Sequence, residues 1–236
     1  MTEFNIIDSK PAVYFPEKGL IAVSDLHLGL EGSMTSRGHY IPEFQLEELK
    51  EELNFLKKET DAERIVVNGD LKNQYSTSYT EKNEIEELLQ HLKETFKDVI
   101  IVKGNHDTFI EDTVKDKGLR TVESYSEDGL LFVHGHEKVE EEFETLVIGH
   151  EHPALALTDE IGVTEKVPCL LHGNTERGEI IVLPAFSKIS RGSEVNRMNK
   201  NELLSPILRD VGLKDFEAYA VSREGGVYDF GKVQNL

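Results

Sequence analysis

The sequence predicts an α/β protein in which two stacked sheets form the core and helices pack outside them. In the first half, short apolar runs alternate with amphipathic helical periods, which is typical of strands joined by helices. From Arg120 onward, short apolar runs follow one another with turn residues between them, so this half is richer in strands. No repeat, linker or low-complexity segment interrupts the 236 residues, and we expect one domain over 1–236.

The first half predicts three strands, each followed by a polar turn and then a helix. The strands are expected at 20–23, 64–68 and 99–102. The helices are expected at 42–58, at about 81–96, and in a short segment that closes at Gly118. Ser78 and Glu81 could form a capping box at the start of the second helix. The stretch 31–41, rich in Gly, Ser and Thr, predicts a loop that could cover a site.

The second half predicts mainly strands. Apolar runs indicate them at 130–133, 146–148, 167–171 and 180–183. A polar helix is expected near 201–210, and a last pair of strands around 218–221 and 226–230.

Composition limits the possible partners. With 26 Lys and Arg against 45 Asp and Glu, the net charge is −19, which repels polyanions and disfavours binding that depends on neutralising many phosphates. Phosphate chemistry remains open, because bound divalent ions can reverse the field inside a cleft. No apolar run reaches the ~18 residues of a membrane span, and the single Cys169 cannot form an intramolecular disulfide. We therefore expect a cytoplasmic protein with no membrane partner.

Side chains suited to chemistry lie directly after the predicted strands. They are Asp25 and His27, Asp70, Asn105 and His106, His134, and His150 and His152. Because ligands in α/β sheets bind beyond the carboxyl ends of the strands, we expect these five strand ends to converge on one pocket.

Each of these motifs also has an ordinary interpretation. Asp25-x-His27 and Gly69-Asp70 occur in simple turns, and Gly104 to Asp107 could be a type I′ or similar turn. His150-x-His152 could belong to an ordinary loop, whereas on an extended segment both rings would point to the same side. Five such motifs, each after an apolar strand, make coincidence a poor explanation.

The residue types favour a metal site. Two Asp, one Asn and four His, with no Cys among them, suit Mn²⁺, Fe, Zn²⁺ or Ni²⁺. Seven side chains exceed what one ion needs, and they suffice for two ions that share a bridging carboxylate.

The order of these motifs over residues 20–153 resembles that of the calcineurin-like metallophosphoesterase superfamily. The resemblance implies a four-layer α/β/β/α sandwich with a two-metal site, with Mn²⁺ the first ion to expect in vitro. It assigns one ion to Asp25, His27 and His152, and the other to Asn105, His134 and His150. Asp70 would bridge both ions.

The resemblance also implies roles beside the metals. His106 would lie next to the scissile phosphate and protonate the leaving oxygen or stabilise the developing charge, and Asp107 could hold the tautomer of His106. Asn73 would support the ligands or the structure. Of His134 and His136 only one is expected to bind metal; we choose His134, which directly follows the strand, and expect His136 to support a ligand or contact phosphate.

A narrower resemblance involves 149–153 and 183–187, together with Gly192 and Asn196. These segments are similar to the ligase-associated DNA damage response endonucleases and their archaeal relatives. By this resemblance, a group of polar side chains could line the cleft and touch a phosphate backbone, namely Ser187, Lys188, Arg191 and Asn196.

The leading hypothesis is a phosphodiesterase that uses two divalent metal ions, with a nuclease role in DNA repair. The charge of −19 favours single-stranded or short nucleic acid over long duplex DNA. One alternative is an enzyme for nucleotides or other small phosphate esters, and a second is a metal-binding scaffold without catalysis. The sequence leaves a homodimer open.

Overall fold

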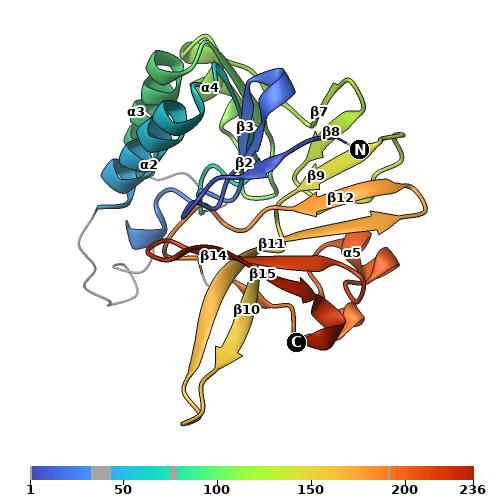
Figure 1. Cartoon of the computed structure of the whole chain (residues 1–236). Coiled ribbons are helices and arrows are strands. Elements are labelled where there is room, and N and C mark those ends of the chain that lie inside the picture. Colours follow the sequence, from blue (N-terminus) through green and yellow to red (C-terminus); the bar gives the residue numbers. More distant parts are fainter. Residues whose placement is uncertain (1, 33–43, 75–78, 191) are drawn as a thin grey trace.

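Two β-sheets stack face to face, and helices cover their outer faces (Figure 1). This architecture comes from a computed structural model that describes residues 2–32, 44–74, 79–190 and 192–236. Three clusters of buried apolar side chains lie between the successive layers. The α/β class with two stacked sheets is therefore confirmed.

The first sheet has six strands in the order β1-β2-β3-β4-β5-β6. From β3 to β6 the strands run parallel, whereas β1, β2 and β3 pair antiparallel. The strands are β1 (Asn5–Ile6), β2 (Val13–Phe15), β3 (Leu20–Val23), β4 (Arg64–Asn68), β5 (Asp98–Val102) and β6 (Thr121–Val122). The three parallel strands expected from apolar runs are present, whereas the short strands β1, β2 and β6 were not expected.

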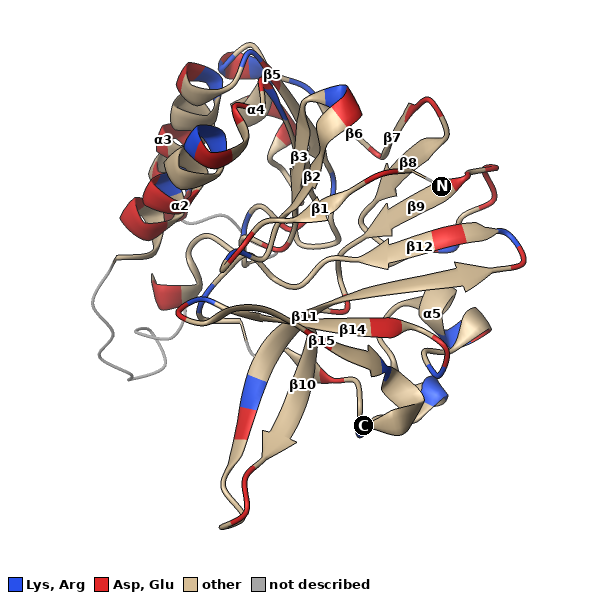
Figure 2. Cartoon of the chain, viewed as in Figure 1, with Lys and Arg blue, Asp and Glu red and all other residues tan. Residues whose placement is uncertain are grey.

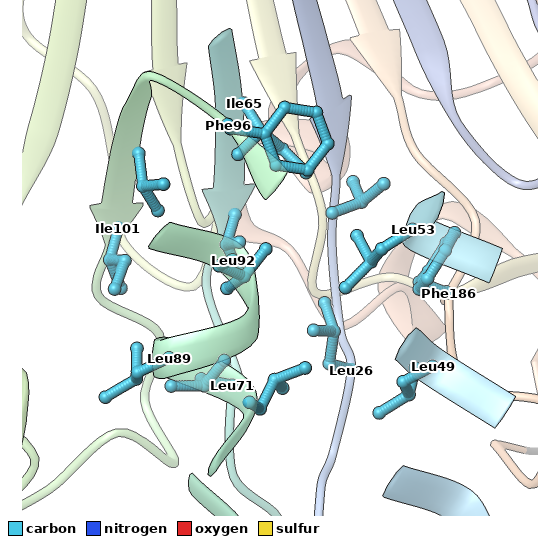
Figure 3. Close-up of a cluster of buried hydrophobic side chains, with 14 of the residues drawn as sticks. Leu26, Leu49, Leu53, Ile65, Leu71, Leu89, Leu92, Phe96, Ile101 and Phe186 are labelled. Atoms are coloured by element: carbon cyan, nitrogen blue, oxygen red, sulfur yellow. The ribbon is translucent and has the colours of Figure 1, made fainter. Parts of the chain in front are cut away.

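Helices α2 (Gln45–Thr60), α3 (Tyr79–Thr95) and α4 (Glu111–Asp116) cover the outer face of this sheet (Figure 1). Leucines spaced three and four residues apart on α2 and α3 pack against the sheet, as Figure 3 shows for Leu53 and Leu92. Helix α2 ends at Thr60 and is followed by its C-cap residue Asp61, which takes a left-handed φ of 52°. The expected start of α2 at Pro42, most of the loop 31–41 and the capping residue Ser78 lie outside the described residues.

The second sheet has nine strands, seven of them in the order β13-β10-β11-β12-β9-β8-β7, with β14 and β15 extending from β11. The strands β8, β9 and β12 run parallel. The strands are β7 (Ser124–Glu127), β8 (Leu130–Val133), β9 (Thr145–Ile148), β10 (Pro153–Thr158), β11 (Thr164–Thr175), β12 (Gly178–Val182), β13 (Ser193–Glu194), β14 (Glu217–Ser222) and β15 (Gly226–Lys232).

Strand β11 is longer than the apolar run 167–171 predicts. Its first residues pair with β10 in a hairpin that projects from the body of the molecule, so 164–166 are exposed and polar (Figure 1). A strand that is solvated along part of its length leaves no apolar signal there.

The outer face of the second sheet is covered by α5 (Pro206–Val211) and by two 3₁₀ turns, at 200–202 and 233–235. The polar helix expected at 201–210 is therefore divided, and α5 begins at Pro206, a residue suited to a first helical turn. Ile207 and Leu208 anchor α5 on the sheet.

Charged residues lie mainly on helices and loops (Figure 2). Along α2 and α3, Lys alternates with Glu, so these helices present no continuous basic stripe. None of the helices in the described ranges is long and apolar enough to cross a membrane.

Candidate metal centre

The loops that follow the parallel strands of both sheets meet at one edge of the sandwich. The loops after β3 and β4 continue the ladder of their strands, because the backbone N–H of His27 donates to the carbonyl of Asp70 at 2.9 Å. The loops after β8 and β9 are joined in the same way, since the N–H of Gly149 donates to the carbonyl of His134 at 2.9 Å. Convergence of these strand ends thus follows from parallel pairing within each sheet and stacking of the two sheets.

Asn68, at the end of β4, ties the two sheets together beneath the centre. Its side-chain amide is fully buried and donates to the carbonyls of Val133 at 3.0 Å and Val147 at 3.1 Å, one on β8 and one on β9. Its own carbonyl accepts from the hydroxyl of Ser24 at 2.8 Å. This residue holds the loops of the first sheet in register with those of the second.

A first group of potential metal ligands consists of Asp25, His27, Asp70 and His152. Each offers one ligand atom, and these atoms lie within 4.8 Å of one another. His152 Nε2 is 2.9 Å from Asp25 Oδ1 and 3.1 Å from His27 Nε2. Such a convergence of two imidazole nitrogens and two carboxylates could hold a divalent ion.

A second group consists of Asp70, His134 and His150, whose ligand atoms also lie within 4.8 Å of one another. His134 Nε2 is 3.3 Å from Asp70 Oδ2 and 3.2 Å from Asn105 Oδ1, so the amide of Asn105 borders this group. His134 Nδ1 donates to the carbonyl of Asn68 at 3.2 Å, which orients the ring with Nε2 facing the group. The structure therefore brings all seven predicted ligands together, with Asp70 common to both groups.

The backbone at this edge is unusual. Left-handed φ angles occur at five of the seven candidate ligands, namely Asp25, His27, Asp70, His150 and His152. His150 and His152 have φ of 65° and 46°, so the expectation that an extended segment points both rings the same way is wrong. Instead, two left-handed residues aim the rings at different groups. Such conformations cost roughly 1 kcal/mol or more each and persist where the surrounding contacts hold them.

Three glycines let the loops approach one another. A Cβ on Gly104 would lie 2.1 Å from Asp70 Oδ1, and one on Gly69 would lie 2.2 Å from His134 Nδ1. A Cβ on Gly149 would lie 1.8 Å from Ser24 Oγ. Neither Asn105 nor His106 has a positive φ, so 104–107 is not a type I′ turn, but a turn is present there because the N–H of Asp107 donates to the carbonyl of Gly104 at 3.2 Å. Gly104 is needed for space.

The electrostatics of the site favour bound cations. Burial would raise the pKa of Asp25, but the adjoining His152 and the other histidines lower it well below its usual range. The pKa of Asp70 is also lowered, because its contact with His134 outweighs burial. Burial would lower the pKa of His134, yet Asp70 and Asp25 raise it to about 9. Two buried carboxylates thus stay ionised and attract positive charge.

Two other histidines are kept neutral. Burial lowers the pKa of His27 to about 4, and burial together with the charge of His134 lowers the pKa of His150 to about 4. A neutral imidazole has a lone pair to offer, which is the form that binds metal. His27 Nδ1 is buried without a hydrogen-bond partner among the described residues.

His106 stands beside the first group, with its ring centroid 5.3 Å from that of His27. Its backbone N–H donates to Asp70 Oδ1 at 2.9 Å, and its Nδ1 lies 2.5 Å from the carbonyl of Asn73. Because a carbonyl only accepts, Nδ1 carries the proton. Asn73 therefore holds the His106 ring through its backbone carbonyl.

The prediction that Asp107 holds the tautomer of His106 is wrong. Both of its carboxylate oxygens accept backbone N–H groups, from Gly104 at 2.9 Å and Lys72 at 3.2 Å. Burial and the nearby charge of Asp70 raise the pKa of Asp107 to about 7. Asp107 shapes the loop that carries His106, while the carbonyl of Asn73 holds the ring.

The residues expected to touch substrate differ in their burial and in their contacts. Ser187 is buried, and its hydroxyl accepts from the Gln45 amide at 3.3 Å. Asn196 uses both ends of its amide on the backbone of Ala156, at 2.9 and 3.1 Å, which replaces its predicted role in the cleft. His136 is half-buried, with its ring centroid 5.3 Å from that of His134.

The structure describes only one of the two remaining predicted contacts. Lys188 pairs with Glu48 at 3.4 Å. Arg191 lies outside the described residues.

Three supporting residues were not expected from the sequence. The buried Gln45 amide donates to the carbonyls of Leu26 at 3.1 Å and His27 at 2.9 Å, so it fixes the loop after β3. The Ser190 hydroxyl lies 2.8 Å from His152 Nδ1. Glu151 accepts the backbone N–H groups of 204 and 205 at 2.8 and 3.0 Å, which ties the loop after β9 to the start of α5. The available signal for Glu151 was its place between His150 and His152, whereas Gln45 and Ser190 carry no comparable signal in the sequence.

Comparison with known proteins gives a family match and several similar folds. The family model for calcineurin-like phosphoesterases matches residues 20–232. None of the curated proteins compared with the chain matches it.

Among solved structures, the nuclease MPE of Pseudomonas putida has a TM-score of 0.66 at 18% identity, covering 97% of this chain and all of that one. A conserved uncharacterised protein of Streptococcus pneumoniae, described as a predicted phosphoesterase, has a TM-score of 0.37 at 14% identity, with 89% and 91% of the two chains covered. Vps29 of Chaetomium thermophilum also has a TM-score of 0.37 at 14% identity, with 74% and 78% covered. At these identities, the first of these structures shows that the chain shares its fold.

Proposed function

The chain belongs to the calcineurin-like phosphoesterase family, and from that premise we propose that it hydrolyses phosphodiester bonds with two divalent metal ions. The observation that carries the proposal is the position of Asp70, whose carboxylate is common to two adjoining groups of ligand atoms. A shared carboxylate is what a pair of ions at one site requires.

We assign the two ions to the two groups of side chains. Asp25, His27 and His152 would hold one ion, and Asn105, His134 and His150 the other, with Asp70 between them. The donor set of oxygens and imidazole nitrogens fits Mn²⁺, Fe, Zn²⁺ or Ni²⁺. When bound, such ions supply Lewis acidity to phosphoryl oxygens and lower the pKa of water.

His106 is the residue we propose as the proton donor. Its Nδ1 is engaged by the carbonyl of Asn73, so the Nε2 edge is the one that can turn toward substrate. In the imidazolium form, Nε2–H would donate to the leaving oxygen and stabilise the charge that develops there. The backbone contact from His106 N–H to Asp70 keeps this ring beside the shared carboxylate.

For the substrate we propose a single-stranded or short nucleic acid, with a role in DNA repair. The fold is similar to that of a protein named as a nuclease, which supports a nucleic-acid diester. The net charge of −19 disfavours long duplex DNA, because such duplexes are held largely through many phosphate contacts.

The test is hydrolysis of bis(p-nitrophenyl) phosphate and of p-nitrophenyl phosphate by metal-stripped protein, with and without Mn²⁺. We expect Mn²⁺-dependent turnover with a clear preference for the diester. Preference for the monoester would favour a phosphatase for small esters. No turnover in protein that has bound two ions would favour a scaffold.

His106→Ala is the matched variant for this test. It should lose turnover while still binding two ions, because none of the ligand groups includes its side chain. If His106→Ala loses metal to the same extent as activity, the assignment of His106 as proton donor is wrong.

A further inference from the structure

Phe109 is an aromatic side chain exposed beside the candidate centre. It is 80% exposed, the highest fraction among aromatic residues in the described ranges. It lies three residues after His106, a separation that extended chain can span in at most about 11 Å. The turn is tighter than that, because the N–H of Thr108 donates to the carbonyl of His106 at 2.8 Å. The backbone of Phe109 therefore lies close to that of the proposed proton donor.

The backbone holds Phe109 in a strained conformation. Its φ is 64°, in the left-handed region where a bulky side chain is a genuine outlier. Such strain persists where it serves a site and the neighbouring structure fixes it. Asp107, anchored by two backbone amides before this residue, and α4, which begins at Glu111 after it, supply that fixation.

Phe44 is a second exposed aromatic residue next to the centre. It is 62% exposed and directly precedes Gln45, whose amide holds the carbonyls of Leu26 and His27. Phe109 thus adjoins His106, and Phe44 adjoins the loop of His27.

We propose that Phe109, together with Phe44, binds the bases of the substrate by stacking, so that the enzyme selects diesters whose sugars carry nucleobases. This inference rests on the proposed phosphodiesterase function and names the part of the substrate that it recognises. Any base offers a π-face, so the selection is for unpaired bases and not for a particular sequence.

Charge explains why stacking suits this protein. With a net charge of −19 and Lys188 already paired with Glu48, the described residues near the cleft offer little attraction to a phosphate backbone. Base–aromatic contacts do not depend on neutralising phosphates. They also require single-stranded substrate, because paired bases are not free to stack on protein.

The test compares two diesters that differ only in their bases. One is the thymidine dinucleotide, and the other has the same sugars and phosphate without bases. The measured quantity is the ratio of kcat/KM for the first to kcat/KM for the second, with saturating Mn²⁺. We expect a ratio of about 5 to 100 for the wild type, the range that stacking of a base on an aromatic ring supplies.

Substitutions test which aromatic side chains produce this ratio of kcat/KM values. Phe109→Ala and Phe109→Leu should bring the ratio down several-fold, and Phe109→Tyr should keep it, because tyrosine retains the π-face. Phe44→Ala should also lower it. The control is Phe55→Ala, an exposed aromatic residue on α2 about 15 Å along the helix from Gln45, which should keep the wild-type ratio.

The outcomes separate this inference from the proposed function. A wild-type ratio near one, or an unchanged ratio in Phe109→Ala, would overturn the stacking role. Turnover of bis(p-nitrophenyl) phosphate with no cleavage of either dinucleotide-like diester would also overturn it, while leaving a metal-dependent diesterase. Absence of turnover on all three substrates by metal-loaded protein would overturn the proposed function itself.

Discussion

At the scale of single residues, Asp70 is the point where the two candidate metal groups meet. Its Oδ2 lies 3.3 Å from His134 Nε2 and 3.8 Å from His27 Nε2, while its Oδ1 accepts the backbone N–H of His106. Loss of this carboxylate would affect both ions and the proposed proton donor together.

Asp70→Ala should therefore reduce turnover more than about 100-fold, because a shared ligand contributes to both ions. Asn73→Ala should cost far less, because the carbonyl that holds His106 remains in alanine. Metal content and Mn²⁺-dependent turnover of both variants would check this. Equal losses in the two would contradict the bridging position of Asp70.

Gly104→Ala should destabilise the protein by about 1–3 kcal/mol and weaken metal binding, because the added Cβ would meet Asp70 at 2.1 Å. Gly32→Ala is the matched control, since a Cβ there meets no atom of the described residues within 4 Å. Urea unfolding and metal titration of both variants would measure the effect. Full metal affinity in Gly104→Ala would show that the loops can move apart without harm.

At the scale of elements, each strand delivers its ligands through the loop that follows it, and other contacts fix those loops. Asn68 joins β4 to β8 and β9 beneath the centre, and Glu151 ties the loop after β9 to α5. At the opposite end of β4, Arg64 reaches across to β7 and pairs with Glu127 at 2.8 Å. The two sheets are thus joined by polar contacts at both ends of one strand.

The Arg64–Glu127 pair predicts a pH dependence of stability. Hydrogen bonds from Arg64 hold the pKa of the Glu127 carboxyl below its usual value of 4.5. The ion pair therefore stabilises the fold at pH values above about 4.5. The contribution is lost as the pH falls through the lowered pKa. Glu127→Gln should cost about 1 kcal/mol near neutral pH, and its deficit should shrink in acid.

Urea unfolding near neutral pH and in acid would measure this, with Asp128→Asn as the control. Asp128 pairs with Lys18 at 2.9 Å, but its side chain is 79% exposed, so little change is expected. If Glu127→Gln lowers the free energy of unfolding by the same amount near neutral pH and in acid, the ion pair is not the source of that loss.

At the scale of the whole molecule, the ligands of each group come from both sheets. Asp25, His27 and Asp70 follow strands of the first sheet, whereas His134, His150 and His152 follow strands of the second. Metal binding should therefore hold the two sheets together, and we propose that the chain unfolds as one domain.

Removing metal should lower Tm by about 5–10 °C in a single transition, since an ion at 100 times its Kd stabilises by about 2.7 kcal/mol. Thermal unfolding with saturating Mn²⁺ and with chelator would measure the shift. Asp70→Ala should show almost no difference between the two conditions. Two separate transitions in the wild type would contradict a single domain.

The sequence alone indicated most of the buried strands, the two long helices and the order of the chemical motifs. Apolar runs and leucine spacing are local signals, so β3, β4, β8 and α3 lie where the runs predict them. The seven candidate ligands could also be picked out in the sequence, because each follows an apolar run and Asp and His are unusually frequent after these runs. The same local signals gave no indication of β1, β2 or the solvated part of β11.

How these motifs act together depends on the packing of the folded chain. The left-handed φ of His150 and His152, the place of Asn68 between the sheets and the contact of His106 with the carbonyl of Asn73 depend on residues far apart in the chain. The exposure of Phe109 is equally invisible in the sequence, where a phenylalanine predicts burial. Composition and periodicity report what each segment prefers, whereas the distances that make a site arise from the packing of one sheet on the other.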